Sequence, residues 1–385
     1  LGNATTASHN TAVGDDALAA NTTGANNTAV GSRALDANTT ASNNVALGYN
    51  AATSSTTADN ITAIGAQALQ NNTGGTDTTA VGAFALKLNT SGDANCAFGR
   101  SSLANNTTGD NNCAFGKNTL AASTTGDNNV AIGHYALPAN TTGSENVAIG
   151  AYSAYKITTA SGNTSIGNYC LYDNTTGHSN TAIGGYSPPT SGSNVIAALR
   201  YNSTGNYNVA VGTGSLALNT TASYNTAVGY KAGYSNSTSS QNTFIGYRAG
   251  RDSNASDVTY VGYDSGYQAT GNSNTCLGHR TMDASGCTGS QNTAIGREAL
   301  SGLTTGTENV ALGYLAGHDV TTGGYNTLLG TNTARILTTG QTNTIVGRDC
   351  AQSLTTGSGN VFLGYKAGSN IDTDDVECPK SIHIV

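Results

Sequence analysis

Glycine returns along this chain at a fixed interval, and that interval constrains the fold more than any other feature. In the first series each member stands seventeen positions after the one before it: Gly14, Gly31, Gly48, Gly65, Gly82, Gly99, Gly116, Gly133, Gly150, Gly167 and Gly184. A second series keeps nearly the same spacing: Gly212, Gly229, Gly246, Gly262, Gly278, Gly296, Gly313, Gly330, Gly347 and Gly364. A repeat this short cannot bury its own apolar residues, so the copies must stack on one another.

The copy that ends at Gly133 illustrates the repeat, and we number each copy from its closing glycine as position 0. Asn129 stands at −4, Ala131 at −2, Ile132 at −1 and Leu137 at +4. The alternation before the glycine predicts a short strand, with −1 and −3 facing the core and the small −2 residue facing a wall or a partner. The Ala-Leu pair predicts a second short strand whose leucine shares that core. The Asn-Thr-Thr-Gly stretch that follows predicts a turn.

The repeat predicts an all-β solenoid, a parallel β-roll with one coil per seventeen-residue repeat, because units this short leave no room for a helix. Between Gly184 and Gly212 the segment Asn194–Ala198 matches the repeat with alanine in place of glycine. This match predicts two 14-residue coils there and about 22 coils in all. We expect one repeat domain over residues 1–368, with short irregular coils at about 185–212. Residues 369–385 break the period and are expected to form an exit segment or cap.

In-register stacking turns each repeat position into a column. Asparagine at −4 predicts an amide ladder along the solenoid. Threonine at +8, from Thr22 to Thr175, permits an ice-binding surface, although adjacent Thr-Thr pairs point to opposite sides and favour solvated turns. Tyrosine at +1 predicts an exposed aromatic ladder, with a glycan-stacking surface as the alternative. These tyrosines are Tyr49, Tyr230, Tyr247, Tyr263, Tyr314 and Tyr365, with Lys231, Arg248 and Lys366 beside three of them.

Other candidate sites have a plain structural interpretation. Cys96 and Cys113 share position −3 in adjacent coils, within disulfide range, but free thiols are favoured in such a column. Cys276 and Cys287 flank one loop and can pair in an oxidising compartment. The Asn-x-Ser/Thr sequons at Asn21, Asn38, Asn140, Asn174 and Asn219 follow from the turn consensus. Three carboxylates near the C-terminus (Asp372, Asp374 and Asp375) can hold Ca²⁺ but lack the glycine and distal glutamate of an EF-hand loop.

Composition excludes several functional classes. Only 10% of residues are charged, the formal net charge is −7 and no Lys/Arg cluster exists, so we expect no nucleic-acid partner. No apolar run approaches the roughly 20 residues of a membrane span, so we expect no membrane insertion. The histidines are scattered and no Cys/His metal spacing is present. We therefore predict no catalytic, cofactor or metal site, and no enzyme.

The pattern Asn-Thr-Thr-Gly-x-x-Asn-Thr-Ala-(Ile/Val)-Gly-x-x-Ala-Leu resembles the head repeats of YadA-like trimeric autotransporter adhesins and the related β-roll repeats of phage tail fibres. A good instance is Asn140–Gly150, preceded by Ala136 and Leu137, and the resemblance covers about residues 3–368. It implies a left-handed β-roll, three parallel chains in a homotrimer, and exposure on a cell or virion. The coils here are longer than those of the adhesin heads, except around Ala198.

The leading hypothesis is a non-enzymatic extracellular fibre or adhesin segment, a rod for surface or host attachment carried by a phage tail or a bacterial surface. Its expected partners are two further copies of the chain, meeting through the −2 alanine column, and a cell-surface glycan or protein receptor. An ice-binding solenoid that uses the threonine column is the alternative. A polysaccharide-cleaving solenoid would need a carboxylate cluster on successive coils, which the sequence does not offer.

Overall fold

The computed structural model describes residues 3–186, 196–370 and 382–384, which contain 22 short strands and no helix. These residues fall into two compact units. The first unit holds residues 3–186 and 200–204, with strands β1 (Thr11–Val13), β2 (Thr28–Val30), β3 (Val45–Leu47), β4 (Thr62–Ile64), β5 (Thr79–Val81), β6 (Cys96–Phe98), β7 (Cys113–Phe115), β8 (Val130–Ile132), β9 (Val147–Ile149), β10 (Thr164–Ile166) and β11 (Thr181–Ile183). The second unit holds residues 196–199, 205–370 and 382–384, with strands β12 (Val209–Val211), β13 (Thr226–Val228), β14 (Thr243–Ile245), β15 (Thr259–Val261), β16 (Thr275–Leu277), β17 (Thr293–Ile295), β18 (Val310–Leu312), β19 (Thr327–Leu329), β20 (Thr344–Val346), β21 (Val361–Leu363) and β22 (Ile382–Ile384).

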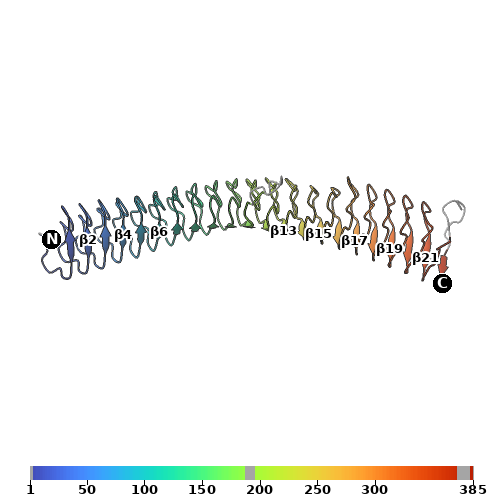
Figure 1. Ribbon diagram of the computed structural model, residues 1–385, viewed down its shortest axis with the longest axis horizontal. Helices are drawn as coiled ribbons and strands as arrows, with labels where there is room; N and C mark the ends of the chain where they lie inside the picture. Colours follow the sequence, from blue (N-terminus) through green and yellow to red (C-terminus); the bar gives the residue numbers. More distant parts are fainter. Residues whose placement is uncertain (1–2, 187–195, 371–381, 385) are drawn as a thin grey trace. The chain divides into compact units, whose positions relative to one another are not determined.

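Consecutive strands within each unit pair in parallel and in register, so equal repeat positions lie side by side. In the first unit, Ala131 of β8 lies opposite Ala114 of β7 and Ala148 of β9. In the second unit, β18 pairs in the same way with β17 and β19. Figure 1 shows the arrows of neighbouring coils side by side in each unit. The predicted parallel β-solenoid, with one coil per repeat, is confirmed.

Each coil contributes one strand, and the predicted second strand is wrong. The segment after Gly133 forms turns, in which Tyr135 and Leu137 have φ angles of 51° and 50°. β-strands require negative φ at every residue. The segment is still tied to its neighbours, because the Leu137 amide donates to the Ser153 carbonyl (3.0 Å). Ala136 and Leu137 are consecutive and both fully buried, which successive side chains of a strand cannot be on one face.

The strands turn position −2 inward, which reverses the predicted orientation. Ala131 is fully buried with Leu137, whereas Ile132 is 40% exposed. Every −2 side chain from β2 to β21 is buried, and none of the −1 side chains is. Alternation shows that neighbours face opposite sides but does not show which side is inside. The +4 leucine already fills the thin interior, so the strand contributes a small residue there and turns its large one outward.

A large −2 residue fills the space beside each glycine at +4: it belongs to the same coil at Gly250, Gly266 and Gly368, and to the next coil at Gly233 and Gly317. Gly250 (φ 56°) stands at +4, and the ring of Phe244 occupies the space that a leucine side chain would need. A methyl group added to Gly250 would overlap that ring. Tyr260 and Gly266 repeat the exchange one coil later. The core therefore stays filled, because a larger side chain at −2 accompanies a smaller one at +4.

Two buried asparagine columns link the coils. At −4, Asn129 donates from Nδ2 to Oδ1 of Asn112 (3.0 Å), and its own Oδ1 accepts from the backbone amide of Asn146 (3.0 Å). At +7, Asn38 donates in the same way to Asn21 (2.8 Å). The predicted ladder at −4 is confirmed, and the ladder at +7 was not predicted. Both columns pair most of the amide groups that the stacked coils bury, although the Oδ1 atoms of Asn38, Asn106 and Asn140 in the +7 column have no partner.

The interval from Gly184 to Gly212 belongs to one enlarged coil, so the prediction of two 14-residue coils is wrong. Bonds that elsewhere join residues 17 apart here join residues 28 apart: Thr175 Oγ1 donates to the Ser203 carbonyl (3.1 Å). Leu199 is buried with φ 47°, as the +4 leucine is in other coils. Ala198 therefore fills position +3, not position 0, and the coil carries 28 − 17 = 11 additional residues. Residues 194 and 195 of the predicted copy lie outside the described residues.

The end of the chain adds a strand to the second unit. After the last closing glycine, β22 pairs in parallel with β21, and Val361 lies opposite Ile382. The three aspartates considered for Ca²⁺ fall between these strands, in residues 371–381, outside the described residues.

Candidate functional site

Positions −3 and −1 of β1–β21 form an outer face on each unit. Position −1 is large and apolar in every one of these strands, and β6 and β7 stack Phe98 on Phe115 with ring centroids 4.7 Å apart. The most exposed members of the column, 46–58% accessible, are Val13, Leu47, Leu277, Leu312 and Leu363. Scattered exposed apolar residues are ordinary, but a contiguous strip of them marks an interaction surface.

The five residues singled out in one copy have separate structural roles. Ala131 and Leu137 form the core, Asn129 belongs to the −4 ladder, and Ile132 lies on the outer face. Gly133 has a φ of 132°, and a methyl group there would lie 2.7 Å from the Gly150 carbonyl group. Glycine is required at position 0 both for this backbone conformation and for the close stacking of coils.

The threonine and sequon columns are engaged with the backbone. At +8, Thr124 Oγ1 donates to the Thr141 carbonyl of the next coil (3.1 Å), so this column gives its hydroxyl protons to the protein. The sequon asparagine Asn140 is buried and donates from Nδ2 to the Gly143 carbonyl (2.8 Å). The same burial and the same bond hold for Asn21, Asn38, Asn174 and Asn219. In the folded chain these nitrogens are inaccessible to a glycosylating enzyme.

The two candidate cysteine pairs are free thiols. Cys96 and Cys113 lie directly opposite each other on β6 and β7, half-buried on the outer face, and burial raises the pKa of both thiols. Cys276 and Cys287 are buried, and burial raises the pKa of the Cys287 thiol to about 11. Because the thiolate is the reactive form, this second pair is protected at neutral pH.

A polar cleft of about 570 Å³ opens on the second unit where the repeat departs from its usual length. The closing glycines Gly246, Gly262, Gly278 and Gly296 are separated by sixteen, sixteen and eighteen positions. The lining residues are Arg248, Tyr263, Asp264, Tyr267, Gln268, His279, Arg280, Asp283 and Ser285. We call this set the polar cleft. Its volume lies within the range of small-ligand sites.

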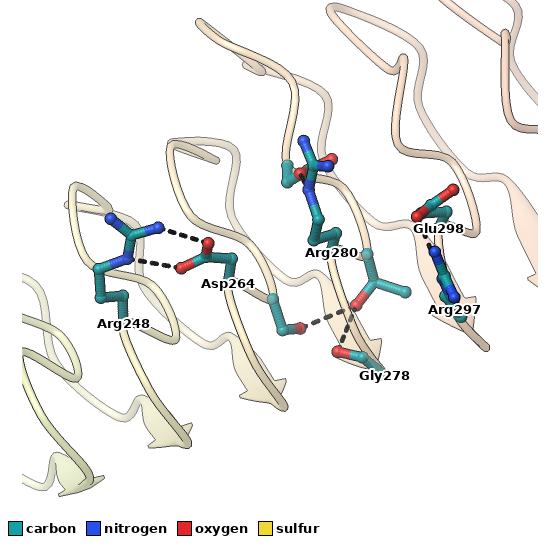
Figure 2. A network of polar contacts seen from close by, with 9 residues as sticks. Arg248, Asp264, Gly278, Arg280, Arg297 and Glu298 are labelled. Atoms are coloured by element: carbon teal, nitrogen blue, oxygen red, sulfur yellow. Dashed lines mark hydrogen bonds and ion pairs between the residues drawn. The ribbon is translucent and has the colours of Figure 1, made fainter.

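Two arginine–aspartate pairs hold the polar groups of the cleft in place. Arg248 donates two parallel hydrogen bonds to Asp264, from Nε to Oδ1 at 2.8 Å and from Nη2 to Oδ2 at 2.5 Å (Figure 2). Arg280 donates from Nε to Oδ2 of Asp283 (2.7 Å). Hydrogen bonding to Asp264 raises the pKa of the Arg248 guanidinium. Burial raises the pKa of Asp283, and Arg280 opposes that shift. The bidentate Arg248–Asp264 pair fixes the orientation of both groups as well as their charge.

An aromatic column at +1 borders the cleft. Tyr247, Tyr263 and His279 stack in sequence, with ring centroids 5.0 Å and 5.1 Å apart and nearly parallel planes. Tyr247 and Tyr263 are each more than 40% exposed. The predicted aromatic ladder is thus present in these coils. The sequence did not predict that it would border a cleft, because that depends on how the irregular coils fold.

A second aromatic cluster, in the first unit, was missed. Tyr152 and Tyr169 at +2 stack at 5.1 Å, and Tyr155 and Tyr172 at +5 stack at 4.9 Å. A shallow apolar groove of about 480 Å³ lies beside this cluster, lined in part by Tyr155. The recurrence of tyrosine at equal offsets in successive coils was the signal available in the sequence.

The described residues contain no cluster of three or more metal-binding side chains. Within the same residues, no helix is long and apolar enough to cross a membrane. We found no family model that matches the chain and no curated protein of significantly similar sequence.

Proposed function

We propose that the chain is a non-enzymatic structural segment of an extracellular fibre, that three copies associate along their outer faces, and that the resulting rod attaches a phage or a bacterium to a surface. The observation that supports this most is the apolar column at −1, repeated in every strand from β1 to β21 although a soluble monomer has no use for it. The sequence had placed the contact on the −2 alanine column. Because that column is buried, the outer face replaces it as the proposed contact.

The size of the outer face fits this association. Three extended residues span about 10 Å and stacked strands lie about 4.8 Å apart, so each coil offers a strip of roughly 50 Å². The eleven strands of the first unit and the ten strands β12–β21 of the second then each offer on the order of 500 Å². In a trimer each chain divides the area of its two strips between two partners, about 500 Å² each, so each interface buries about 1,000 Å² in total, which is the lower bound for a specific interface. A cyclic arrangement places equal positions of the three chains around a common axis.

Sedimentation equilibrium tests the assembly. We expect a mass three times the chain mass of 38.5 kDa. The double variant Leu47→Asp/Leu312→Asp places one charge on the outer face of each unit and is expected to give a monomer with an unchanged circular dichroism spectrum. The matched control Thr40→Asp/Thr305→Asp adds the same charges at exposed +9 positions and should remain trimeric.

Two results would contradict this proposal. A native chain that sediments as a monomer or a dimer rules out the trimer. Thermal hysteresis by a monomer would favour the ice-binding alternative.

A further inference from the structure

The polar cleft exists because one coil is locally lengthened. In the coil of Gly133 the buried +7 residue follows the buried +4 residue by three positions, as Asn140 follows Leu137. In the coil of Gly278 the buried Cys287 follows the buried Met282 by five positions. Two residues are therefore added after Met282. They lie in the stretch that brings Asp283 and Ser285 to the wall of the cleft.

The backbone ladder resumes on both sides of this lengthened stretch. The Met282 amide donates to the Ala299 carbonyl (3.2 Å), and the Thr288 amide donates to the Thr304 carbonyl (2.6 Å). The added residues therefore change the surface without changing the stacking of the solenoid. This lengthening of one coil leaves the fold intact and opens a cleft. A binding site on a repeat scaffold requires both.

The charges in the cleft select the class of ligand. Each of the two arginines is paired with an aspartate, so the cleft has no excess of either sign to attract an anion or a cation. Its remaining groups are phenol hydroxyls, a carboxamide, an imidazole and a serine hydroxyl, which both donate and accept hydrogen bonds. Such a lining suits a neutral ligand that carries many hydroxyl groups.

The cleft also offers apolar contact beside its polar groups. The rings of Tyr263 and His279 stand in the stacked column, and the Arg248 guanidinium lies over the ring of Tyr267, with its central carbon 4.8 Å from the ring centroid. A sugar ring presents hydroxyl groups and C–H groups together. Fixed Arg–Asp pairs can donate to one hydroxyl and accept from the next. Because Tyr263 is stacked between Tyr247 and His279, the exposed edges of these rings contact the C–H groups.

We infer that the polar cleft on the second unit binds a neutral oligosaccharide, with Asp264 and Arg248 recognising its hydroxyl groups and the exposed edges of Tyr263 and His279 contacting its ring. This inference names the class of receptor for the attachment role, and so rests on the proposed function. It differs from the predicted glycan-stacking surface, which was a general property of all +1 tyrosines. Here the site is confined to the coils whose length departs from the period.

Binding of the full 385-residue chain to an immobilised panel of neutral and sialylated oligosaccharides tests the inference. The strongest neutral binder is then titrated by calorimetry. Ser285→Trp fills the exposed rim of the cleft, and Asp264→Asn removes one carboxylate while keeping its shape. We expect each to weaken binding at least tenfold. Thr305→Trp, at an exposed position of the same unit, and Tyr152→Ala, in the aromatic cluster of the first unit, should bind like the native chain.

Several outcomes would overturn the inference. These are the absence of any neutral binder in the panel, recognition only of sialylated glycans with strong dependence on salt, or affinity unaffected by both cleft variants. Sedimentation of the same samples separates the two proposals. A trimer whose binding ignores the cleft variants refutes the cleft alone, whereas a monomer whose binding depends on the cleft refutes the assembly alone.

Discussion

At the scale of single residues, the solenoid depends on positions with positive φ that are filled by residues other than glycine. Leu137 is buried at φ 50°, a conformation that costs an L-residue roughly 1–2 kcal/mol. Burial of a leucine side chain returns about 1.5–3 kcal/mol, which offsets that cost. Where the chain uses Gly250 at this position the strain disappears, but the side chain is lost, and Phe244 supplies the missing volume.

This exchange predicts strong coupling between Phe244 and Gly250. Phe244→Ala alone leaves a cavity and is expected to destabilise by about 3–5 kcal/mol. Gly250→Leu alone places a leucine against the Phe244 ring and should also destabilise. The double variant recreates the Ala/Leu pairing seen at Ala131 and Leu137. It should have a higher urea midpoint than either single variant. Strictly additive losses would show that the two positions do not share one space.

The sequence allowed part of this residue-level picture to be predicted. The seventeen-residue period, the apolar column at −1 and the ladder that contains Asn129 followed from the spacing alone. Stacked coils bring equal repeat positions side by side. The orientation of Ala131 and Ile132 did not follow, because an alternating pattern does not show which of its two faces is buried. The exchange between Phe244 and Gly250 was visible as a simultaneous change at −2 and +4. It could not be interpreted while −2 was placed outside the core.

At the scale of the strand, the three residues of each strand face two sides: position −2 packs in the core, and positions −1 and −3 lie on the outer face. The residue at −2 packs against the +4 residue in the core, and the residues at −1 and −3 are partly or fully exposed to solvent. The same division recurs from β2 to β21, so it belongs to the repeat and not to one coil. The core of a coil and the proposed contact between chains can therefore be tested at adjacent residues of one strand.

Adjacent aspartate substitutions in β8 should have opposite effects. Ala131→Asp buries a charge without a partner and is expected to destabilise the first unit by several kcal/mol, seen as a large drop in melting temperature. Ile132→Asp adds its charge at a 40% exposed position and should leave the fold of the isolated chain nearly unchanged. If Ile132→Asp unfolded the unit while Ala131→Asp did not, the assignment of the two faces would be wrong.

At the scale of the whole molecule, the coils whose length departs from the period distinguish one part of the surface from another, which the regular coils do not. Each coil contacts mainly its neighbours, so a local change in length is absorbed locally and is tolerated. The cleft near Asp283 arises from one such change, and the enlarged coil between Gly184 and Gly212 is another. The sequence displayed both irregularities. Placing them required the hydrogen bonds of the adjacent coils.

The enlarged coil gives the most direct test of this view. Deleting residues 187–197 removes the additional stretch and joins Tyr186 to Ala198, which restores the sequence Gly-x-x-Ala-Leu after Gly184 and the regular spacing to Gly212. Leu199 and Ser203 already make the bonds of a regular coil, so the shortened chain should fold. A shorter chain segment between the bonded residues also costs less entropy to close, so the melting temperature should stay the same or rise slightly. A deletion variant that fails to fold, measured by circular dichroism and thermal denaturation, would show that the additional residues are required for the stability of the solenoid.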